Sequence, residues 1–85
     1  GEFYGINEEI HLHVLPAQQA VVINIFNLSD QSRPISGQIE LGKIGLDPAR
    51  SYRADNPNCR IEEGILKVNQ ELPAWGAEVA ELRAE

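Results

Sequence analysis

The segment from Glu9 to Val14 reads Glu-Ile-His-Leu-His-Val and alternates strictly between polar and apolar side chains. In an extended strand this order places Ile10, Leu12 and Val14 on one face and both histidines on the other. The pattern therefore predicts a strand with one buried face and one solvent-facing face. No segment of the chain shows a convincing apolar run at the spacing of a helix.

A second apolar segment, residues 20–28, follows after Pro16 and a short polar connection. Its two faces carry Val21, Ile23 and Ile25 on one side and Val22, Phe26 and Leu28 on the other. Because a strand that is apolar on both faces is typical of a sheet interior, we expect a central strand with Phe26 in the core.

Five further short strands are predicted at residues 34–41, 50–55, 60–62, 65–72 and 77–83, separated by segments rich in Gly, Pro and Asn. Gly37 falls on the apolar face of the first of these, which indicates a bulge or a close neighbour. Val79 and Leu82 do not fit one alternating phase, so a bulge or an edge position is expected in the last strand.

Seven short strands with regular turn signals predict an all-β fold, an antiparallel, Greek-key-like β-sandwich of about seven strands. The abundance of isoleucine and valine, fourteen residues together, agrees with this because β-branched side chains favour strands. Residues 9–85 are expected to form this single domain. Residues 1–8 are expected to be an irregular segment, either native or left over from expression.

The composition limits the classes of partner. The 85 residues carry a net charge of −6 with only two lysines, so the chain has no basic surface for nucleic acid or anionic membranes. The one cysteine, Cys59, excludes an internal disulfide and leaves the compartment open. At this length one modest core is possible, whereas a two-lobed catalytic cleft is not expected.

The strand pattern limits what the candidate chemical groups can do. His11 and His13 could supply two metal ligands from one strand face, with Cys59 as a third only if its strand lay alongside. We expect instead two solvent-facing histidines and a buried cysteine, and neither a metal nor a cofactor. The carboxylates Glu8-Glu9 and Glu62-Glu63 are adjacent in the sequence and indicate solvated charge rather than a catalytic pair. We therefore expect no catalytic residues in this segment.

Three aromatic residues lie outside the predicted strands and are candidate contact residues. Trp75 follows Leu72-Pro73 in a turn, where it could cap the end of the sandwich, contact a neighbouring domain or offer a platform for a sugar ring, in that order of expectation. Phe3 and Tyr4 precede the first strand and are expected to belong to an interdomain contact. Asn27 also begins an N-glycosylation sequon, although turn chemistry already explains its side chain.

The order of these segments resembles the C-terminal β-sandwich of glycoside hydrolases, and within them the α-galactosidase (melibiase) type. The resemblance extends from Val21 to Leu82. It is carried by residues 25–30 (Ile-Phe-Asn-Leu-Ser-Asp), 45–48 (Gly-Leu-Asp-Pro) before Tyr52, 66–68 (Leu-Lys-Val) and 72–79 (Leu-Pro-Ala-Trp-Gly-Ala-Glu-Val). Leu28 differs from the aromatic residue that often follows this Asn in the family.

The resemblance implies a non-catalytic accessory domain that packs against a catalytic (β/α)₈ barrel of the same polypeptide, with the catalytic aspartates on the barrel. The segment itself is then not an enzyme, its parent is a glycoside hydrolase, and no functional residue is carried over from the family. Because three aromatic residues lie outside the predicted strands, we expect Trp75, Phe3 and Tyr4 to form part of the contact. Two alternatives remain open, a free-standing carbohydrate-binding module with exposed aromatic residues on one sheet face, and a structural or adhesive sandwich of the fibronectin kind.

Overall fold

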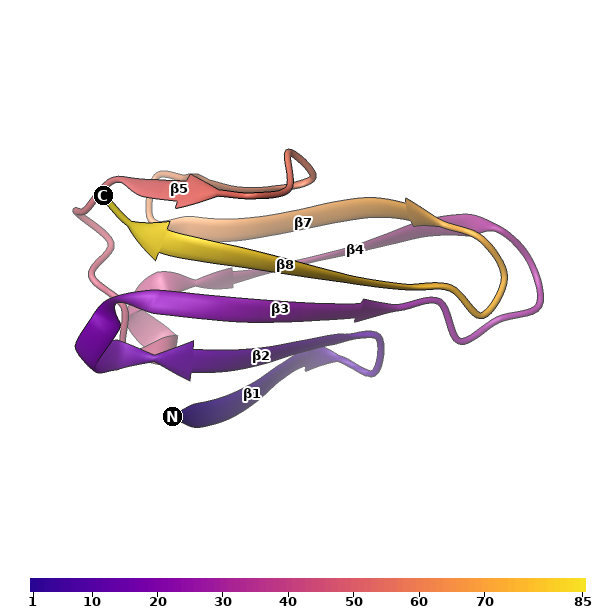
Figure 1. Ribbon diagram of the computed structural model, residues 1–85, viewed down its shortest axis with the longest axis horizontal. Coiled ribbons are helices and arrows are strands. Elements are labelled where there is room, and N and C mark those ends of the chain that lie inside the picture. The colour runs from indigo at the N-terminus through magenta and orange to yellow at the C-terminus, as the bar shows by residue number, and fades with distance from the viewer.

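The computed structural model describes all 85 residues and consists of two antiparallel β-sheets packed face to face (Figure 1). The predicted all-β sandwich is confirmed. The eight strands are β1 (Glu2–Asn7), β2 (Ile10–Leu15), β3 (Ala20–Phe26), β4 (Arg33–Glu40), β5 (Tyr52–Ala54), β6 (Cys59–Glu62), β7 (Ile65–Leu72) and β8 (Ala77–Ala84). Two short 3₁₀ helices, η1 (Pro16–Gln18) and η2 (Leu41–Ile44), complete the fold.

The strand order is β1-β2-β3-β8-β5 in the five-stranded sheet and β4-β7-β6 in the three-stranded sheet. Strands far apart in sequence are neighbours, β3 with β8 and β4 with β7, which is the nested pairing of a Greek-key-like sandwich rather than a simple meander. Both termini lie at the same end of the molecule, and the β3–β4 loop and the β7–β8 turn project at the other end (Figure 1).

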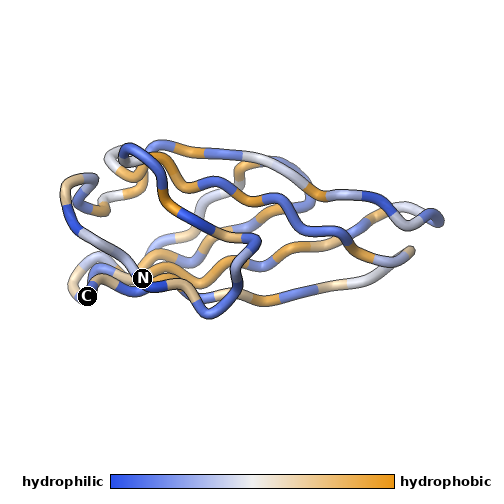
Figure 2. Tube along the Cα trace, turned by 90° about the horizontal axis from the view of Figure 1, so that it is seen from above, coloured by the Kyte–Doolittle hydropathy of each residue, from blue (hydrophilic) through white to orange (hydrophobic).

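The alternation in β2 and β3 has the predicted consequence. Leu12 lies opposite Ile23, and both side chains are buried between the sheets. The position of β3 in the middle of the five-stranded sheet confirms that it is a central strand. Figure 2 shows the two layers on edge, with hydrophobic and hydrophilic residues alternating along the strands.

A single core of sixteen buried residues joins the two sheets and η2. Burial of these aliphatic side chains supplies the main driving force for folding. The core consists of Ile10, Leu12, Val14, Val21, Ile23, Ile25, Ile35, Leu41, Ile44, Leu46, Cys59, Leu66, Val68, Leu72, Ala80 and Leu82.

The N-terminal segment differs from the expectation that residues 1–8 are irregular. Residues 2–7 form β1, an edge strand paired with β2, and bring the number of strands to eight. Tyr4 and Ile6 point inward and pack against the core, whereas Phe3 and Gly5 pair with outward-facing residues of β2. The alternation is therefore present, but its inward positions are only partly buried because β1 lies at the edge.

Two predictions about inward-facing residues are wrong. Phe26 does not lie in the core: Ile25 occupies the buried position, and Phe26 is half-buried on the outer face of the sheet. The last strand has neither a bulge nor an edge position, because β8 lies between β3 and β5 in continuous register. Ala80 and Leu82 point inward, and Val79 is simply exposed on the outer face.

Two glycines have structural roles. A Cβ atom on Gly37 would lie 2.8 Å from Cγ2 of Ile6, so β4 and β1 approach closely at this point, which confirms the predicted close neighbour. Gly45 ends η2 with a φ of 79°, a left-handed conformation that favours glycine, and its N–H donates to the Leu41 carbonyl. The turn places Leu46 in the core.

Candidate functional site

The outer face of the five-stranded sheet carries a group of apolar and imidazole side chains. Phe3, His13 and Val22 lie side by side on three neighbouring strands. The Phe3 ring is 78% exposed and stacks on the His13 imidazole, with 4.3 Å between ring centroids and 10° between the planes. Parallel stacking at this distance holds an otherwise free ring flat against the sheet.

The same face continues toward the ends of β2 and β3. The His11 imidazole meets the Phe26 ring edge-on, with centroids 5.9 Å apart and an interplanar angle of 68°. Nε2 of His11 lies 2.8 Å from the Glu8 carbonyl, which fixes the orientation of the ring. Asn24 separates His11 from Val79 of β8, which is 59% exposed.

We refer to Phe3, His11, His13, Val22, Phe26 and Val79 as the aromatic face. The outer face of the three-stranded sheet is different in kind, because its strands there present polar and charged residues such as Ser36, Gln38, Lys67 and Asn69. The outer face of β1 to β3 is thus suited to an apolar contact, whereas Glu81 and Arg83 make the adjoining part of β8 charged.

Tyr4 does not belong to the aromatic face, although it was predicted together with Phe3. Adjacent residues of a strand point to opposite sides, so Tyr4 faces inward and packs at the margin of the core. Its hydroxyl donates to Oε2 of Glu2 at 3.0 Å, and this bond raises the pKa of Tyr4 above its usual value.

Trp75 lies in the β7–β8 turn, at the end of the molecule opposite the termini (Figure 1). Its side chain is 68% exposed, so it does not cap the sandwich, which was the first expectation for this residue. Its φ is 57°, a left-handed conformation that is uncommon for a bulky side chain and costs about 1–2 kcal/mol. The structure does not bring Trp75 and Phe3 onto one surface.

The turn around Trp75 is held by Asn27, the only buried polar residue. Nδ2 of Asn27 donates to the carbonyls of Gln31, Leu72 and Pro73 at 2.8, 3.1 and 3.0 Å. Its Oδ1 accepts from both the N–H and the hydroxyl of Ser29 at 3.1 and 2.8 Å. One amide side chain therefore fastens the β3–β4 loop to the β7–β8 turn.

A polar hollow of about 360 Å³ opens beside this loop and is lined by Asn7, Glu8, Glu9, Leu28 and Arg33. Oε2 of Glu9 accepts from the Leu28 N–H at 2.8 Å and is ion-paired with Arg33. The bond from the Leu28 N–H, with a smaller effect of Arg33, lowers the pKa of Glu9 below its usual value. The hollow thus contains a carboxylate that is ion-paired with a guanidinium.

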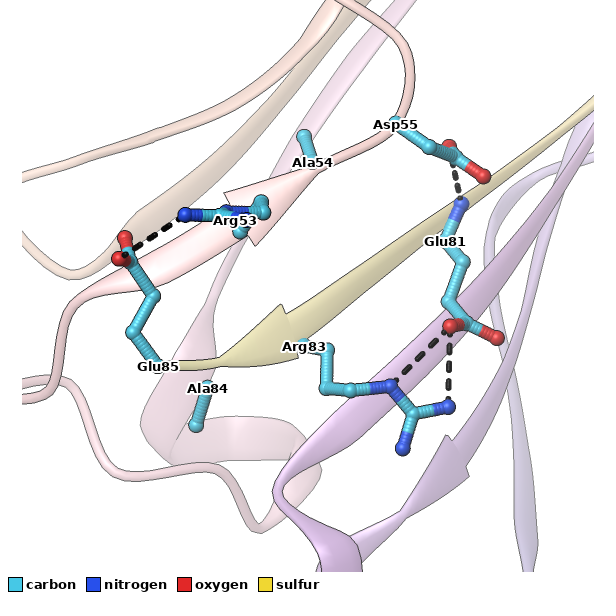
Figure 3. A pocket seen from close by; sticks show the side chains of 7 residues that line it. All are labelled: Arg53, Ala54, Asp55, Glu81, Arg83, Ala84 and Glu85. Atoms are coloured by element: carbon cyan, nitrogen blue, oxygen red, sulfur yellow. Dashed lines mark hydrogen bonds and ion pairs between the residues drawn. The ribbon is translucent and has the colours of Figure 1, made fainter.

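A larger depression of about 420 Å³ lies over β5 and β8 (Figure 3). Its charged side chains are already paired, Arg83 with Glu81 at 2.9 Å and Arg53 with Glu85 at 3.9 Å. Oδ1 of Asp55 accepts from the Glu81 N–H at 2.8 Å and extends the strand pairing. These groups stabilise the edge of the sheet rather than forming an acid and base pair.

The remaining candidate groups are dispersed. Both histidines point outward, as predicted, and no three His, Cys, Asp or Glu side chains are arranged to hold a metal ion. Cys59 is buried, as predicted, and burial with a smaller effect of Asp55 and Glu78 raises its pKa to about 11. Glu62 is paired with Arg60 at 2.6 Å. No helix of the structure has the length and hydrophobicity needed to cross a bilayer.

Comparison with protein-family models, with characterised proteins and with solved structures gave no match. The candidate surfaces therefore rest on the geometry of this chain alone.

The sequence interpretation missed most residues of these surfaces: it predicted only Phe3 of the aromatic face, and it did not predict Glu9 and Arg33 as a pair. The alternation already placed both histidines outward, and the order Phe3-Tyr4-Gly5-Ile6 alternates as well. Taken together, these two signals would have predicted Phe3 beside His13. The pairing of Glu9 with Arg33 had no local signal, because it joins the β1–β2 turn to the start of β4.

Proposed function

We propose that this chain is the non-catalytic accessory β-sandwich of a glycoside hydrolase of the α-galactosidase type, and that it packs against the catalytic (β/α)₈ domain of the same polypeptide. The proposal starts from the sequence resemblance and is supported by the β-sandwich fold. An accessory domain of this kind stabilises the catalytic domain through an interdomain contact of mixed polarity.

The segments that carry the resemblance have defined structural roles, which supports the proposal. Asn27 fastens two loops, Gly45 ends η2 and positions Leu46, and the Tyr52 hydroxyl donates to the Asp47 carbonyl at 2.7 Å. Motifs that determine turns in this way are expected to recur in domains with the same fold rather than in domains with the same ligand.

The aromatic face is the single observation that carries the proposed contact. The outward-facing residues of a water-exposed sheet are normally polar, as they are in the three-stranded sheet. The five-stranded sheet instead exposes Phe3 and Val79 on its outer face. Phe3 lies in β1, so the aromatic face reaches the end of the molecule at which both termini lie (Figure 1).

The test compares the 85-residue chain with the full protein encoded by its gene. Hydroxyl-radical footprinting followed by mass spectrometry measures the oxidation rates of Phe3, His13 and Phe26 in both proteins. We expect these rates to fall severalfold in the full protein, because the catalytic domain covers the aromatic face. Lys67, on the polar outer face of the other sheet, serves as the reference and is expected to react equally in both.

Two results would contradict the proposal. One is a full protein that contains no barrel-sized domain or has no glycosidase activity on aryl α-galactosides. The other is equal oxidation of Phe3 and His13 in the two proteins, which would leave the aromatic face without a partner.

A further inference from the structure

The tip of the sandwich combines an exposed ring with a polar hollow. Trp75 and Leu28 are 68% and 52% exposed, on the β7–β8 turn and the β3–β4 loop respectively. Ser29 links the β7–β8 turn to the hollow: its carbonyl accepts from the backbone N–H of Trp75 at 3.1 Å, and its hydroxyl accepts from Nε of Arg33, a residue that lines the hollow, at 3.2 Å. The backbone of Trp75 and the guanidinium of Arg33 thus both contact Ser29.

The tip is held in this form against a conformational cost. Trp75 keeps a left-handed backbone and an exposed side chain, although Gly or Asn would fit that backbone position with less strain. The three carbonyl contacts of Asn27 and the bond from the Gly76 N–H to the Pro73 carbonyl, 2.9 Å, keep the turn in place. A strained and exposed tryptophan that the core does not need points to a binding role.

The surroundings of the ring favour a small polar ligand over a protein. Glu8, Asp30 and Glu71 are exposed near the tip, whereas acidic residues are depleted in the centre of protein interfaces. One indole and one leucine also offer far less area than the ~800 Å² that each partner of a typical protein complex buries. A pyranose ring fits better, because its apolar face stacks on an indole while its hydroxyl groups bond to charged planar groups.

We propose that the tip is a binding site for a neutral saccharide, with a pyranose ring stacked on Trp75 and its hydroxyl groups bonded in the hollow by Glu9 and Arg33. The second carboxylate oxygen of Glu9, Oε1, accepts none of the hydrogen bonds within the chain and is available to a hydroxyl group. The site is independent of the aromatic face, so it does not rest on the proposed contact with a catalytic domain.

The experiment uses the 85-residue chain and takes advantage of Trp75 as its only tryptophan. Neutral gluco-, galacto-, manno- and xylo-oligosaccharides are titrated while the indole emission is followed. We expect a saturable blue shift with at least one of them, in the millimolar range or tighter. Two-dimensional NMR is expected to show shifts confined to residues 7–9, 27–33 and 72–76.

Variants then separate the contact from a general effect on folding. Trp75→Ala is expected to weaken binding about tenfold or more by NMR titration, and Trp75→Tyr to restore part of it. Glu9→Gln keeps an acceptor for the Leu28 N–H and is expected to weaken binding severalfold. Phe3→Ala, on the aromatic face, is the matched control and is expected to leave binding unchanged.

Three results would overturn this site. These are no saturable binding of any of the four saccharide classes, binding that Trp75→Ala leaves unchanged, or NMR shifts that map to the aromatic face. Burial of Trp75 in the full protein without added saccharide would assign the tip to a protein contact instead. The footprinting of Phe3 and His13 is unaffected by these outcomes, so failure of the saccharide site and failure of the accessory role can be told apart.

Discussion

The ring of Phe3 lies parallel to the imidazole of His13, with 4.3 Å between their centroids. This contact joins the edge strand β1 to β2 on the outer face of the sheet, where no core residue could do so. The two residues also explain why a segment with few buried side chains is an ordered strand.

Phe3→Ala removes this stack. We expect a loss of about 0.5–1.5 kcal/mol in the free energy of unfolding, since an aromatic pair contributes roughly this much beyond its buried area. The ring protons of His13 should lose an upfield ring-current shift in the NMR spectrum, whereas those of His11, which contacts Phe26, should keep theirs. Unchanged His13 resonances would contradict the stacked geometry.

Asn27→Ala is expected to be the most destabilising polar substitution, at about 2–4 kcal/mol. The reason is that it removes the hydrogen bonds through which this buried amide ties the β3–β4 loop to the Leu72 and Pro73 carbonyls. Urea unfolding measures the change. Asn24→Ala is the matched control, because Asn24 lies in the same strand, faces outward and makes no side-chain hydrogen bond. A similar loss in both variants would exclude the proposed role of the Asn27 amide.

Gly37→Ala tests the close approach of β4 and β1. The added methyl group would lie 2.8 Å from Cγ2 of Ile6, so we expect a destabilisation of about 1–3 kcal/mol from overpacking. Gly42→Ala is the control, since nothing lies within 4 Å of its Cβ position, and it should change stability by less than about 0.5 kcal/mol. Equal stability of the two variants in thermal unfolding would count against this packing.

Glu9 makes stability dependent on pH in the acid range. Its pKa is lower in the folded than in the unfolded state, where it is near 4.5, so the stabilisation is present above that value and is lost as pH falls through the folded pKa. Glu9→Gln should therefore flatten the decline of Tm with acidification. Glu8→Gln, at the neighbouring exposed position, should retain the wild-type slope of Tm against pH. A flatter slope in Glu8→Gln than in Glu9→Gln would refute the role of Glu9.

Cys59 is expected to be unreactive in the folded chain. Its pKa rises from 9.0 to about 11, so at pH 8 the thiolate fraction is about 100-fold smaller than in the unfolded chain, and burial slows alkylation further. Iodoacetamide labelling followed by mass spectrometry, with and without denaturing urea, measures the ratio. Comparable rates in the two conditions would show that β6 opens readily.

Local alternation predicted most of the fold, because the inward phase of a half-polar strand is visible in its own residues. Ile10, Leu12 and Val14 are an example, and Leu66 and Val68 are another. Alternation could not decide between Ile25 and Phe26, since both faces of β3 are apolar and the neighbouring strands determine which face is covered. The edge strand β1 was missed because neither of its faces is fully buried: its inward-facing residues, Tyr4 and Ile6, are only partly covered.

The candidate surfaces were harder to predict than the strands because they depend on register between distant segments. The sequence placed Trp75 in a turn, but its exposure depends on how Asn27 ties that turn to the β3–β4 loop. Phe3, Tyr4 and Trp75 were expected to take part in one interdomain contact. They do not share a surface within this chain, because adjacent strand residues face opposite sides and the turn lies at the far end of the sandwich.

The amide of Asn27 also determines how the chain responds to a glycosylating host. The sequon Asn27-Leu28-Ser29 offers Nδ2 for glycan transfer. In the folded protein, however, Nδ2 is buried and donates to the carbonyl of Leu72, which lies 45 residues further along the chain. A glycan on Nδ2 would displace this buried contact, so glycan attachment opposes closure of the sandwich at this loop. In a secretory expression host, modified chains should remain unfolded, and only unmodified chains should yield the native domain.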